Sequence, residues 1–473
     1  MDSLALSLIA EWTSGRLYGK DCLVRCIAYD TRSEVGNALY VCLRGERFDG
    51  HEFCQEAVDK GATALLVEQL QTTISLGQVV VKNTQVALAQ IAAAMQRRRR
   101  TRVFGITGSN GKTTVKSMLF AILKHWGQKQ QQTVYMNPGN YNNEIGLPIS
   151  VIRAPEAVDN AIYEMGAGKP NDIAYLTGII QPSIALVNAI APAHLERLGH
   201  LLGVARTKGA IYSALTDNGV AVVNADDAFG QWFIQTCVPR NCRILRFAIN
   251  ASAEIRASHI CVSSEFSQFH LMTPAGSILV KIPLLGLHHV RNALAAAAMA
   301  SAAQVPLAAI AQGLAEVKPP PGRQQVYTLR NSVTLIDDSY NANIGSVQAA
   351  IDVLAKRAPA WLVLGDMHEL GPQGSQWHAY IGQLARQAGI KRLYTLGLLS
   401  QAAAHSFGQD AVACINGHDQ LIAQLQADLD AYCQIDSPAQ PVLTMLIKGS
   451  RASAMNKIVE ALMASHGGKM DVA

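Results

Sequence analysis

Short apolar runs alternate with turn-rich and helix-compatible stretches from the start of the chain. In the first eighty residues, apolar runs at 38–43, 64–67 and 79–81 surround one helical stretch at 52–60. Continuous apolar runs bounded by turn signals are typical of buried strands, whereas amphipathic helices repeat apolar residues every three or four positions. The pattern predicts a small N-terminal α/β domain over residues 1–83.

A helix-compatible stretch at 85–98 leads into a longer strand–helix alternation, which continues to about residue 318. Strands are expected at 103–106, 161–165, 184–190 and 220–224, with helices such as 115–125 and 290–303 between and after them. Strands that alternate with helices favour a largely parallel sheet with helices on both faces. We therefore expect a central phosphate-loop-type domain over residues 84–317.

The segment Lys318-Pro319-Pro320-Pro321-Gly322 reads as a stiff linker, because consecutive prolines cannot continue a helix. The alternation then restarts, with strands expected at 333–338, 361–365, 392–396 and 442–447 and helices at 346–356, 376–388 and 452–463. This pattern predicts a Rossmann-like C-terminal domain over residues 318–473, although it lacks a Gly-x-Gly-x-x-Gly fingerprint. The predicted fold is thus a three-domain α/β protein.

Composition narrows the class of protein. The formal net charge of +5 is a mild surplus for 473 residues, and the basic run 97–100 fits the solvated end of a helix, so we expect no nucleic-acid partner. Nine cysteines without a Cys-x-x-Cys pair fit reduced thiols in a cytoplasmic enzyme. The N-terminus has no basic segment and no run approaches the roughly 18 apolar residues of a spanning helix. We expect a monomer that is neither secreted nor embedded in a membrane.

The strongest chemical signal is Thr-Gly-Ser-Asn-Gly-Lys-Thr-Thr at 107–114, which follows an apolar strand and precedes a helix. In such a loop the glycines bring backbone N–H groups against phosphates, the lysine reaches the β- and γ-phosphates, and the next hydroxyl binds Mg²⁺. Ile106 stands where the common pattern has its first glycine, which argues against the usual GTPases and kinases. We expect a nucleoside triphosphate to contact Thr107, Gly108, Ser109, Asn110, Gly111, Lys112, Thr113 and Thr114.

Polar residues also follow the predicted strands: the segment 140–146, Glu164, His194 and, further on, Lys208. Open α/β sheets bind ligands at the carboxyl ends of their strands. Taken alone, Glu164 could cap a helix, His194 could be a hydrogen-bonded surface histidine and Lys208 could be a solvated charge. Their shared placement beside a phosphate loop favours ligands for divalent metal ions.

The chain resembles the Mur ligases, the ATP-dependent family that builds the peptide stem of bacterial cell-wall precursors. Besides the phosphate loop, the resemblance rests on motifs along nearly the whole chain. These are 30–32 and 48–51 near the N-terminus, 141–146, 164–166, 194–196, Lys208, 286–288 and 292–294 in the centre, and 322–323, 337–343, 364–371 and 448–451 near the C-terminus.

The strings Asp-Asp-Ser-Tyr-Asn-Ala-Asn at 337–343 and Lys-Gly-Ser-Arg at 448–451 favour one branch of this family. That branch uses ATP to add D-alanyl-D-alanine to UDP-N-acetylmuramoyl-tripeptide through an acyl phosphate. The resemblance implies two Mg²⁺ sites, with Thr113 and Glu164 on one and His194 and Lys208, carbamylated by CO₂, on the other. Lys112, Glu164, His194 and Lys208 would form the catalytic centre.

The resemblance also implies contacts to substrates. Asn292 would contact the adenine, Arg323 the phosphates and Asp338 the ribose of ATP. Thr31 and Arg32 would contact the uridine nucleotide, and Tyr340, Asn341 and Asn343 are candidates for the dipeptide.

Three positions depart from the family pattern. Ala210 replaces a glutamate that commonly follows the carbamylated lysine, Ile344 replaces a proline and His289 an asparagine. The support of Lys208 is therefore left open, as are the third stem residue (diaminopimelate or lysine) and whether the domains rest open or closed. Two alternative functions also stay open: another amide ligase, folylpolyglutamate synthase-like or acting earlier in cell-wall synthesis, or a nucleotide-dependent binding or switch protein.

Overall fold

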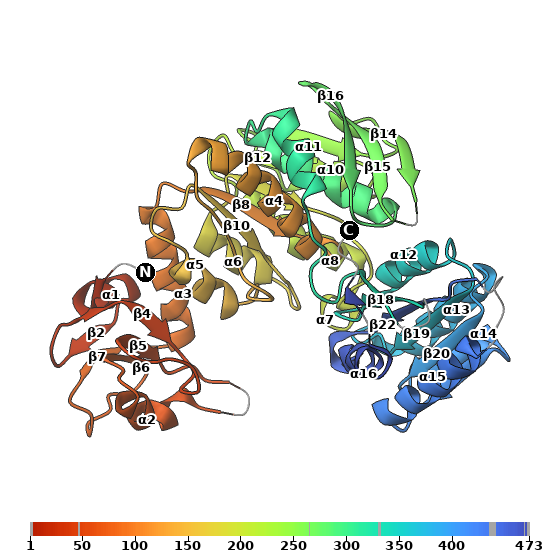
Figure 1. Cartoon of the computed structure of the whole chain (residues 1–473). Helices are drawn as coiled ribbons and strands as arrows, with labels where there is room; N and C mark the ends of the chain where they lie inside the picture. Colours follow the sequence, from red (N-terminus) through yellow and green to blue (C-terminus); the bar gives the residue numbers. More distant parts are fainter. Residues whose placement is uncertain are drawn as a thin grey trace.

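The N-terminal part of the chain folds around a five-stranded sheet, at the red end of the molecule in Figure 1. The computed structural model describes residues 3–45, 48–263, 265–329, 333–434, 441–467 and 469–470. The sheet has the order β2 (Arg16–Tyr18), β7 (Gly77–Val80), β6 (Ala64–Val67), β5 (Ala38–Val41) and β4 (Cys26–Ala28). Only the β2–β7 pair is antiparallel. Around it lie α1 (Leu6–Thr13), η1 (Gly50–Phe53), α2 (Cys54–Asp59) and the small pair β1 (Leu4–Ala5) and β3 (Leu23–Val24). The expected strands and helix of this region are confirmed.

The central part contains a nine-stranded sheet in the order β16-β15-β14-β13-β12-β11-β8-β10-β9. Its strands are β8 (Arg102–Thr107), β9 (Val134–Met136), β10 (Asn160–Glu164), β11 (Ile184–Val187), β12 (Val220–Asn224), β13 (Arg243–Ala248), β14 (Ile255–Val262), β15 (Ser267–Thr273) and β16 (Gly276–Ile282). All pairs from β9 to β14 are parallel, as expected, but β14, β15 and β16 form an antiparallel extension that the sequence did not indicate.

Helices cover both faces of the central sheet, because successive side chains of its strands point to opposite sides. Val103 packs into one core with α3 (Thr84–Arg98), α5 (Gly146–Arg153), α6 (Asp172–Ile180) and α8 (Leu201–Ser213). Phe104 packs into the other core with α4 (Lys112–Gln130), α10 (Leu287–Ala302) and α11 (Leu307–Ala315). The shorter α7 (Leu195–Leu198) and α9 (Gly230–Thr236) complete this part. The apolar run of β8 therefore reflects burial on both faces.

The C-terminal part has a seven-stranded sheet in the order β21-β20-β19-β22-β18-β17-β23. Its strands are β17 (Gln325–Thr328), β18 (Thr334–Asp338), β19 (Ala360–Gly365), β20 (Arg392–Leu396), β21 (Ala411–Cys414), β22 (Thr444–Lys448) and β23 (Lys469–Met470). The helices are α12 (Ile344–Leu354), α13 (Gly374–Gln387), α14 (Gln401–Phe407), α15 (His418–Cys433) and α16 (Asn456–His466), with short turns η3 (Gly371–Gln373) and η4 (Arg451–Ser453). The five strands from β21 to β18 are parallel, as expected for a Rossmann-like arrangement.

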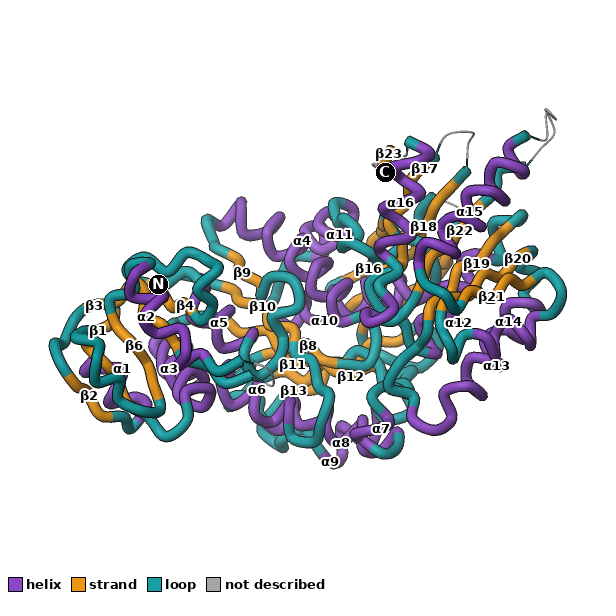
Figure 2. Tube along the Cα trace, turned by 90° about the horizontal axis from the view of Figure 1, so that it is seen from below, coloured by secondary structure: helices purple, strands orange, loops and turns teal. Residues whose placement is uncertain are grey.

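Figure 2 shows the three sheets one after another along the molecule, with the central sheet between the other two. The carboxyl ends of β10, β8 and β11 are adjacent, and the C-terminal part lies beside this edge. No helix among the described residues is both long and apolar enough to span a membrane.

Candidate active site

The phosphate loop joins the end of β8 to the start of α4, which confirms the predicted strand–loop–helix setting. Gly108 and Gly111 have φ angles of 146° and 78°. A Cβ atom on Gly111 would collide with the side-chain amides of Asn188 and Asn292. The loop therefore requires glycine at this position for its backbone angle and for the close approach of two neighbouring chains.

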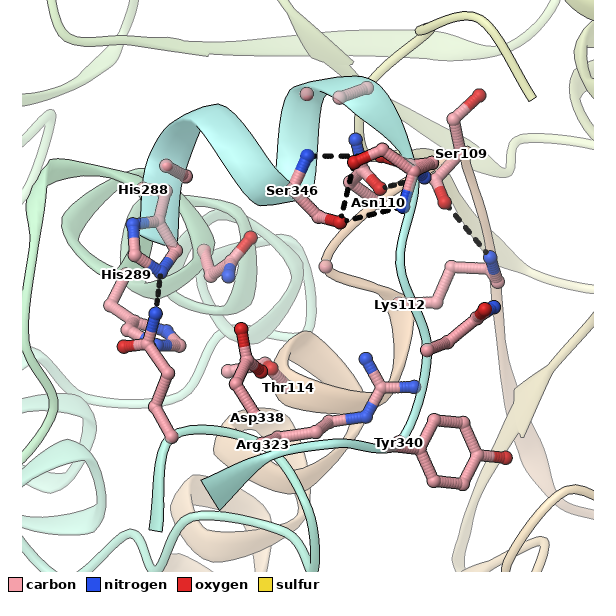
Figure 3. A pocket seen from close by; sticks show the side chains of 18 of the residues that line it. Ser109, Asn110, Lys112, Thr114, His288, His289, Arg323, Asp338, Tyr340 and Ser346 are labelled. Atoms are coloured by element: carbon pink, nitrogen blue, oxygen red, sulfur yellow. Dashed lines mark hydrogen bonds between the residues drawn. The ribbon is translucent and has the colours of Figure 1, made fainter. Parts of the chain in front are cut away.

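A cavity of about 320 Å³ lies between this loop and the C-terminal part of the chain (Figure 3). Most of the nucleotide and dipeptide residues expected from the sequence line it. They are Ser109, Asn110, Gly111, Lys112, Thr114, Asn292, Arg323, Asp338, Tyr340, Asn341 and Asn343. Residues more than 200 positions apart thus meet in one site.

Thr107, Gly108 and Thr113 do not line this cavity. Thr107 is buried and its Oγ1 donates to the carbonyl of Met165 at 2.9 Å. The Gly108 carbonyl accepts from Lys112 Nζ at 2.7 Å, so the lysine folds back over its own loop. Burial lowers the pKa of Lys112; Glu164 opposes this effect and the charge of Arg323 adds to it.

Other lining residues were not assigned from the sequence. Gln324 connects the adjacent rings of His288 and His289, at 3.3 and 3.2 Å from an Nε2 atom of each. Asn188 follows the end of β11 and donates to Asn292 Oδ1 at 2.9 Å. Its position after a strand was an available signal, but the predicted strand 184–190 extended past it, whereas β11 ends at Val187.

Asp338 and Lys448 form a buried ion pair at the end of β18, with 2.6 Å between Nζ and Oδ2. Burial raises the pKa of Asp338, and the adjacent Lys448 ammonium opposes this shift. The Asp338 Oδ1 atom accepts no hydrogen bond from the described residues, and Asp338 lines the cavity.

Glu164 ends β10 and is almost fully buried, with 3% of its surface exposed. Its Oε2 accepts from Thr113 Oγ1 at 3.0 Å and lies 3.2 Å from Lys116 Nζ, while Oε1 accepts from Asn142 at 3.0 Å. Burial alone would raise the pKa of Glu164, but Lys116, Lys112, Arg323 and the Thr113 bond together hold it below its usual value. The interpretation of Glu164 as a helix cap is wrong; it is an ionised carboxylate next to the phosphate loop.

Thr113 and Glu164 fit a magnesium site, because both offer oxygen atoms and lie within hydrogen-bond distance of each other. Among the described residues, no group of three or more His, Cys, Asp or Glu side chains could hold a metal ion. A site of this kind relies on phosphate oxygens and water for its other ligands, which is usual for Mg²⁺.

His194 precedes α7 with a φ of 53°, in the left-handed region that is uncommon for residues other than glycine. Its Nδ1 lies 2.5 Å from Oε2 of Glu369, which belongs to the C-terminal part. The carboxylate is in direct contact with the Nδ1 edge of the ring, although the Nδ1–H direction departs from hydrogen-bond geometry. The ring is 32% exposed and has a carboxylate partner, so the interpretation of His194 as a hydrogen-bonded surface histidine stays open.

Lys208 lies inside α8 with 1% of its surface exposed, so the interpretation of it as a solvated charge is wrong. Burial, reinforced by the charge of Lys112, lowers its pKa well below the ordinary value, and Asp172 only partly opposes this. Within the described residues its Nζ makes no hydrogen bond or ion pair. Ala210, at the departure from the family pattern, packs against an apolar core and offers no polar support.

Thr31 and Arg32 do not line the cavity beside the phosphate loop. Thr31 is buried and its carbonyl accepts from Lys60 Nζ at 2.8 Å, whereas the exposed Arg32 pairs with Asp30 at 2.7 Å. Their neighbour Tyr29 contacts the hydroxyl of Tyr141 at 3.3 Å. The loop of Thr31 and Arg32 is thereby joined to the 140–146 segment, whose Asn142 holds Glu164.

A second cavity of about 870 Å³ adjoins the first, and both are lined by Arg323 and Tyr340. Thr113 and Lys116 line it from the central part, and Arg451 lines it from the C-terminal part. The guanidinium carbons of Arg323 and Arg451 lie 4.5 and 5.5 Å from the centre of the Tyr340 ring. This cavity places two guanidinium groups and the Lys116 ammonium beside Thr113, which is expected to bind Mg²⁺.

Comparisons with known proteins agree with this architecture. Three family profiles match the chain. The profile "Mur ligase family, catalytic domain" matches residues 23–103, and "Mur ligase middle domain" matches residues 106–300. The profile "Mur ligase, glutamate ligase domain" matches residues 322–451. The UDP-N-acetylmuramoyl-tripeptide–D-alanyl-D-alanine ligase of Escherichia coli (strain K12) is 40% identical over 98% of this chain and 99% of its own. The enzyme of that name from Haemophilus influenzae is 36% identical over the same shares.

Solved structures give the same result. A crystal structure of MurF from Acinetobacter baumannii superposes with a TM-score of 0.90 and 28% identity, covering 98% of this chain and 99% of that one. A MurF ligase from Thermotoga maritima in complex with ADP has the same fold, with a TM-score of 0.80 and 24% identity over 94% and 98% of the two chains. The chain belongs to the Mur ligase family and is a ligase.

Proposed function

We propose that this ligase uses ATP to join D-alanyl-D-alanine to UDP-N-acetylmuramoyl-tripeptide, giving the pentapeptide precursor of peptidoglycan with ADP and phosphate. The observation that carries the proposal is the cavity between the phosphate loop and the C-terminal part, whose lining comes from both sides. Full-length similarity to ligases named for this reaction supports the choice of substrates.

We assign the smaller cavity to ATP. The loop amides of Ser109, Asn110 and Gly111 and the ammonium of Lys112 would hold the phosphates, with Arg323 approaching them from the linker. Asn292 on α10 would meet the adenine. Because Lys448 already occupies Oδ2 of Asp338, its Oδ1 is an available acceptor for a ribose hydroxyl.

We assign two metal ions to the edge between the strand ends. Thr113 and Glu164 would hold one Mg²⁺, and His194 with carbamylated Lys208 would hold the other. Carbamylation needs a neutral amine, which adds to the carbon of CO₂ and loses a proton, and the lowered pKa of the buried Lys208 favours that form. When bound, Mg²⁺ would neutralise the charge that develops on the transferred phosphoryl group.

The tripeptide carboxylate attacks the γ-phosphorus of ATP in the proposed first step, giving an acyl phosphate and ADP. The free amine of D-alanyl-D-alanine then attacks the acyl carbon, an amide bond forms, and phosphate leaves with the oxygen from the carboxylate. A carboxylate accepts an amine only after one of its oxygens becomes a good leaving group, so ATP is chemically required. The chain contributes position and charge neutralisation, mainly through Lys112.

The larger cavity suits the acceptor dipeptide. It borders Thr113, where the acyl phosphate would form, and its cations Arg323 and Arg451 complement a free carboxylate. Tyr340, whose ring lies near both guanidinium groups, lines both cavities. Asn341 and Asn343 line the smaller cavity beside it, and all three remain our candidates for contacts to the dipeptide. Thr31 and Arg32 would hold the uridine end of the other substrate, and the Tyr29–Tyr141 contact leads from there to the catalytic edge.

We also propose that the enzyme acts in the cytoplasm, since all nine of its cysteines are free thiols, as is usual in a reducing compartment. A monomer remains our proposal for its oligomeric state. The proposed domain bounds remain 1–83, 84–317 and 318–473. Closure of the C-terminal domain over ATP would exclude water from the acyl phosphate.

The decisive experiment measures ADP release by the purified chain with UDP-N-acetylmuramoyl-tripeptide, adding D-alanyl-D-alanine or single amino acids in turn. Tripeptides ending in diaminopimelate and in lysine are both offered, and the product is identified by mass. We expect release that depends on the dipeptide. Stimulation by a single amino acid alone would indicate another amide ligase, and ATP binding without acceptor-dependent release would indicate a switch or binding protein.

A further inference from the structure

Glu369 of the C-terminal part reaches across the domain interface to His194, which lies between β11 and α7 of the central part. The two side chains are half-buried, with 47% and 32% of their surfaces exposed, and their closest atoms are 2.5 Å apart. The charges facing Glu369 are those of His194 and Arg197 from the central part and of His368 from its own loop. A single carboxylate from one domain thus meets a predicted metal ligand of the other.

The loop that carries Glu369 is held in an uncommon conformation. Glu369 has a φ of 63°, in the left-handed region that is unfavourable for residues other than glycine. The two residues before Glu369 are both anchored: the backbone N–H of Met367 donates to His378 at 2.9 Å, and His368 Nδ1 lies 2.5 Å from the Ser450 hydroxyl, just after β22. The strained residue is therefore fixed by its neighbours, as is common where a side chain must be aimed at a site.

The contact uses only one of the two ring nitrogens of His194. Nδ1 faces the carboxylate, while Nε2 makes no hydrogen bond with any described residue. A carboxylate at Nδ1 favours the tautomer that carries its proton there and leaves the lone pair of Nε2 available to a metal ion. Carboxylates in this position orient metal-binding histidines and increase their basicity.

We infer that Glu369 is a positioning residue for His194, which it holds with Nε2 directed to the second Mg²⁺ site when the two domains are together. This inference rests on the proposed function, because it requires His194 to bind a metal ion. It also gives the C-terminal domain a part in metal binding: the second site would be complete only while Glu369 reaches the central domain.

The chain offers a matched comparison in His125 and Glu316. Their Nδ1 and Oε1 atoms are 3.0 Å apart, but both lie in the central part, and the second nitrogen of His125 already contacts Gln312 at 2.8 Å. This histidine has no ring nitrogen left for a metal ion. Glu316→Gln thus removes a histidine–carboxylate contact without touching the proposed site.

The test measures Mn²⁺ binding to the full-length chain with a non-hydrolysable ATP analogue, by electron paramagnetic resonance. We expect two Mn²⁺ per parent chain. Glu369→Ala should weaken the second ion about 10- to 100-fold and leave the first unchanged. Glu369→Gln keeps an acceptor oxygen and should lose less, and Glu316→Gln should bind both ions as the parent does. Thermal unfolding verifies that each variant is folded.

The inference would be overturned by wild-type affinity for both ions in Glu369→Ala, or by equal weakening in Glu316→Gln. A parent chain that binds only one Mn²⁺ would also overturn it, whereas the proposed ligation is judged separately by ADP release. The dependence of activity on Mg²⁺ gives a second readout. A positioning role predicts a higher Mg²⁺ concentration at half-maximal rate in Glu369→Ala, with most of the rate recovered at saturation.

Discussion

Asn343 donates a 2.6 Å hydrogen bond to Oδ1 of Asn110, which lies 233 positions earlier in the phosphate loop. The same side chain caps α12: its Oδ1 accepts from the backbone N–H of Ser346 at 3.0 Å, and the Ser346 hydroxyl accepts from the Asn343 N–H. One amide therefore starts a helix of the C-terminal part and ties that part to the loop expected to bind ATP.

Replacing Asn343 by aspartate should separate these two tasks. Asn343→Asp keeps the capping oxygen, since aspartate and asparagine cap helices equally well, but it removes the donor to Asn110. It also adds a negative charge beside the expected phosphates. We expect the KM for ATP to rise about tenfold, equivalent to ~1.4 kcal/mol, with the unfolding temperature nearly unchanged. Steady-state ADP release and thermal unfolding provide the measurements.

The matched control is Asn83→Asp. Asn83 caps α3 in the same way, accepting from the Val86 N–H at 2.9 Å, but lies away from the phosphate loop. It should leave the KM for ATP unaltered. An unchanged KM in Asn343→Asp as well would mean that its contact with Asn110 has no part in nucleotide binding.

Lys112→Ala should abolish ligation. The ammonium lies against its own loop carbonyl at 2.7 Å, at the position where phosphate oxygens are expected. Its loss removes the charge that stabilises the phosphoryl group during transfer, so we expect acceptor-dependent ADP release to fall about 100-fold or more. Lys124→Ala removes an exposed lysine from the same helix and should retain the parent rate. Comparable rates for the two variants would contradict the assignment of Lys112.

Lys208→Ala tests the proposed carbamate. A direct metal ligand should matter at least as much as the outer partners of ligands, whose loss costs about 10- to 100-fold, so we expect a drop of that size or larger. Short carboxylic acids should restore part of the rate, because they can fill the space of the missing carbamate with an anion. The same acids should not restore Lys112→Ala. Full activity of unrescued Lys208→Ala would refute the role.

Much of the site could be predicted because it follows the order of the central strands. The phosphate loop, Glu164 and the segment before His194 each come after a buried strand, and β8, β10 and β11 are neighbours in the sheet. A continuous apolar run identifies such a strand, and the polar residue after it then falls at the shared edge. The burial of Lys208 was not visible in this way, because its helix is covered on the face that carries it.

The antiparallel strands β14–β16 were missed for a physical reason. Their residues alternate between buried and exposed, as the exposed Leu279 beside the buried Val280 illustrates, so no continuous apolar run marks them. Contacts between domains carried no signal either. The pairs Asn110–Asn343, His194–Glu369 and Tyr29–Tyr141 depend on how separate domains pack, and no spacing within one sequence encodes that packing.

His289, which replaces the asparagine of the family pattern, should make the protein sensitive to acid. It is 4% exposed, and burial lowers its pKa to about 4, with the Gln324 contact opposing and the charge of Arg323 adding to the shift. In the unfolded chain a histidine has a pKa of about 6.5. At a pH between these two pKa values, His289 is therefore protonated in the unfolded chain but neutral in the folded protein. The contribution of His289 to stability is present above pH 6.5 and is lost as the pH falls toward 4.

His289→Asn should remove this pH-dependent contribution to stability. From the two pKa values, we expect the parent to lose about 2 kcal/mol more unfolding free energy than the variant between pH 7 and pH 5. Urea titrations of both proteins at the two pH values measure the difference, and His405→Asn, which replaces an exposed histidine of α14, is the control. Because His288 is present in all three proteins, its own effect largely cancels. An identical loss of stability in parent and His289→Asn would show that His289 is protonated in the folded state as readily as in the unfolded chain.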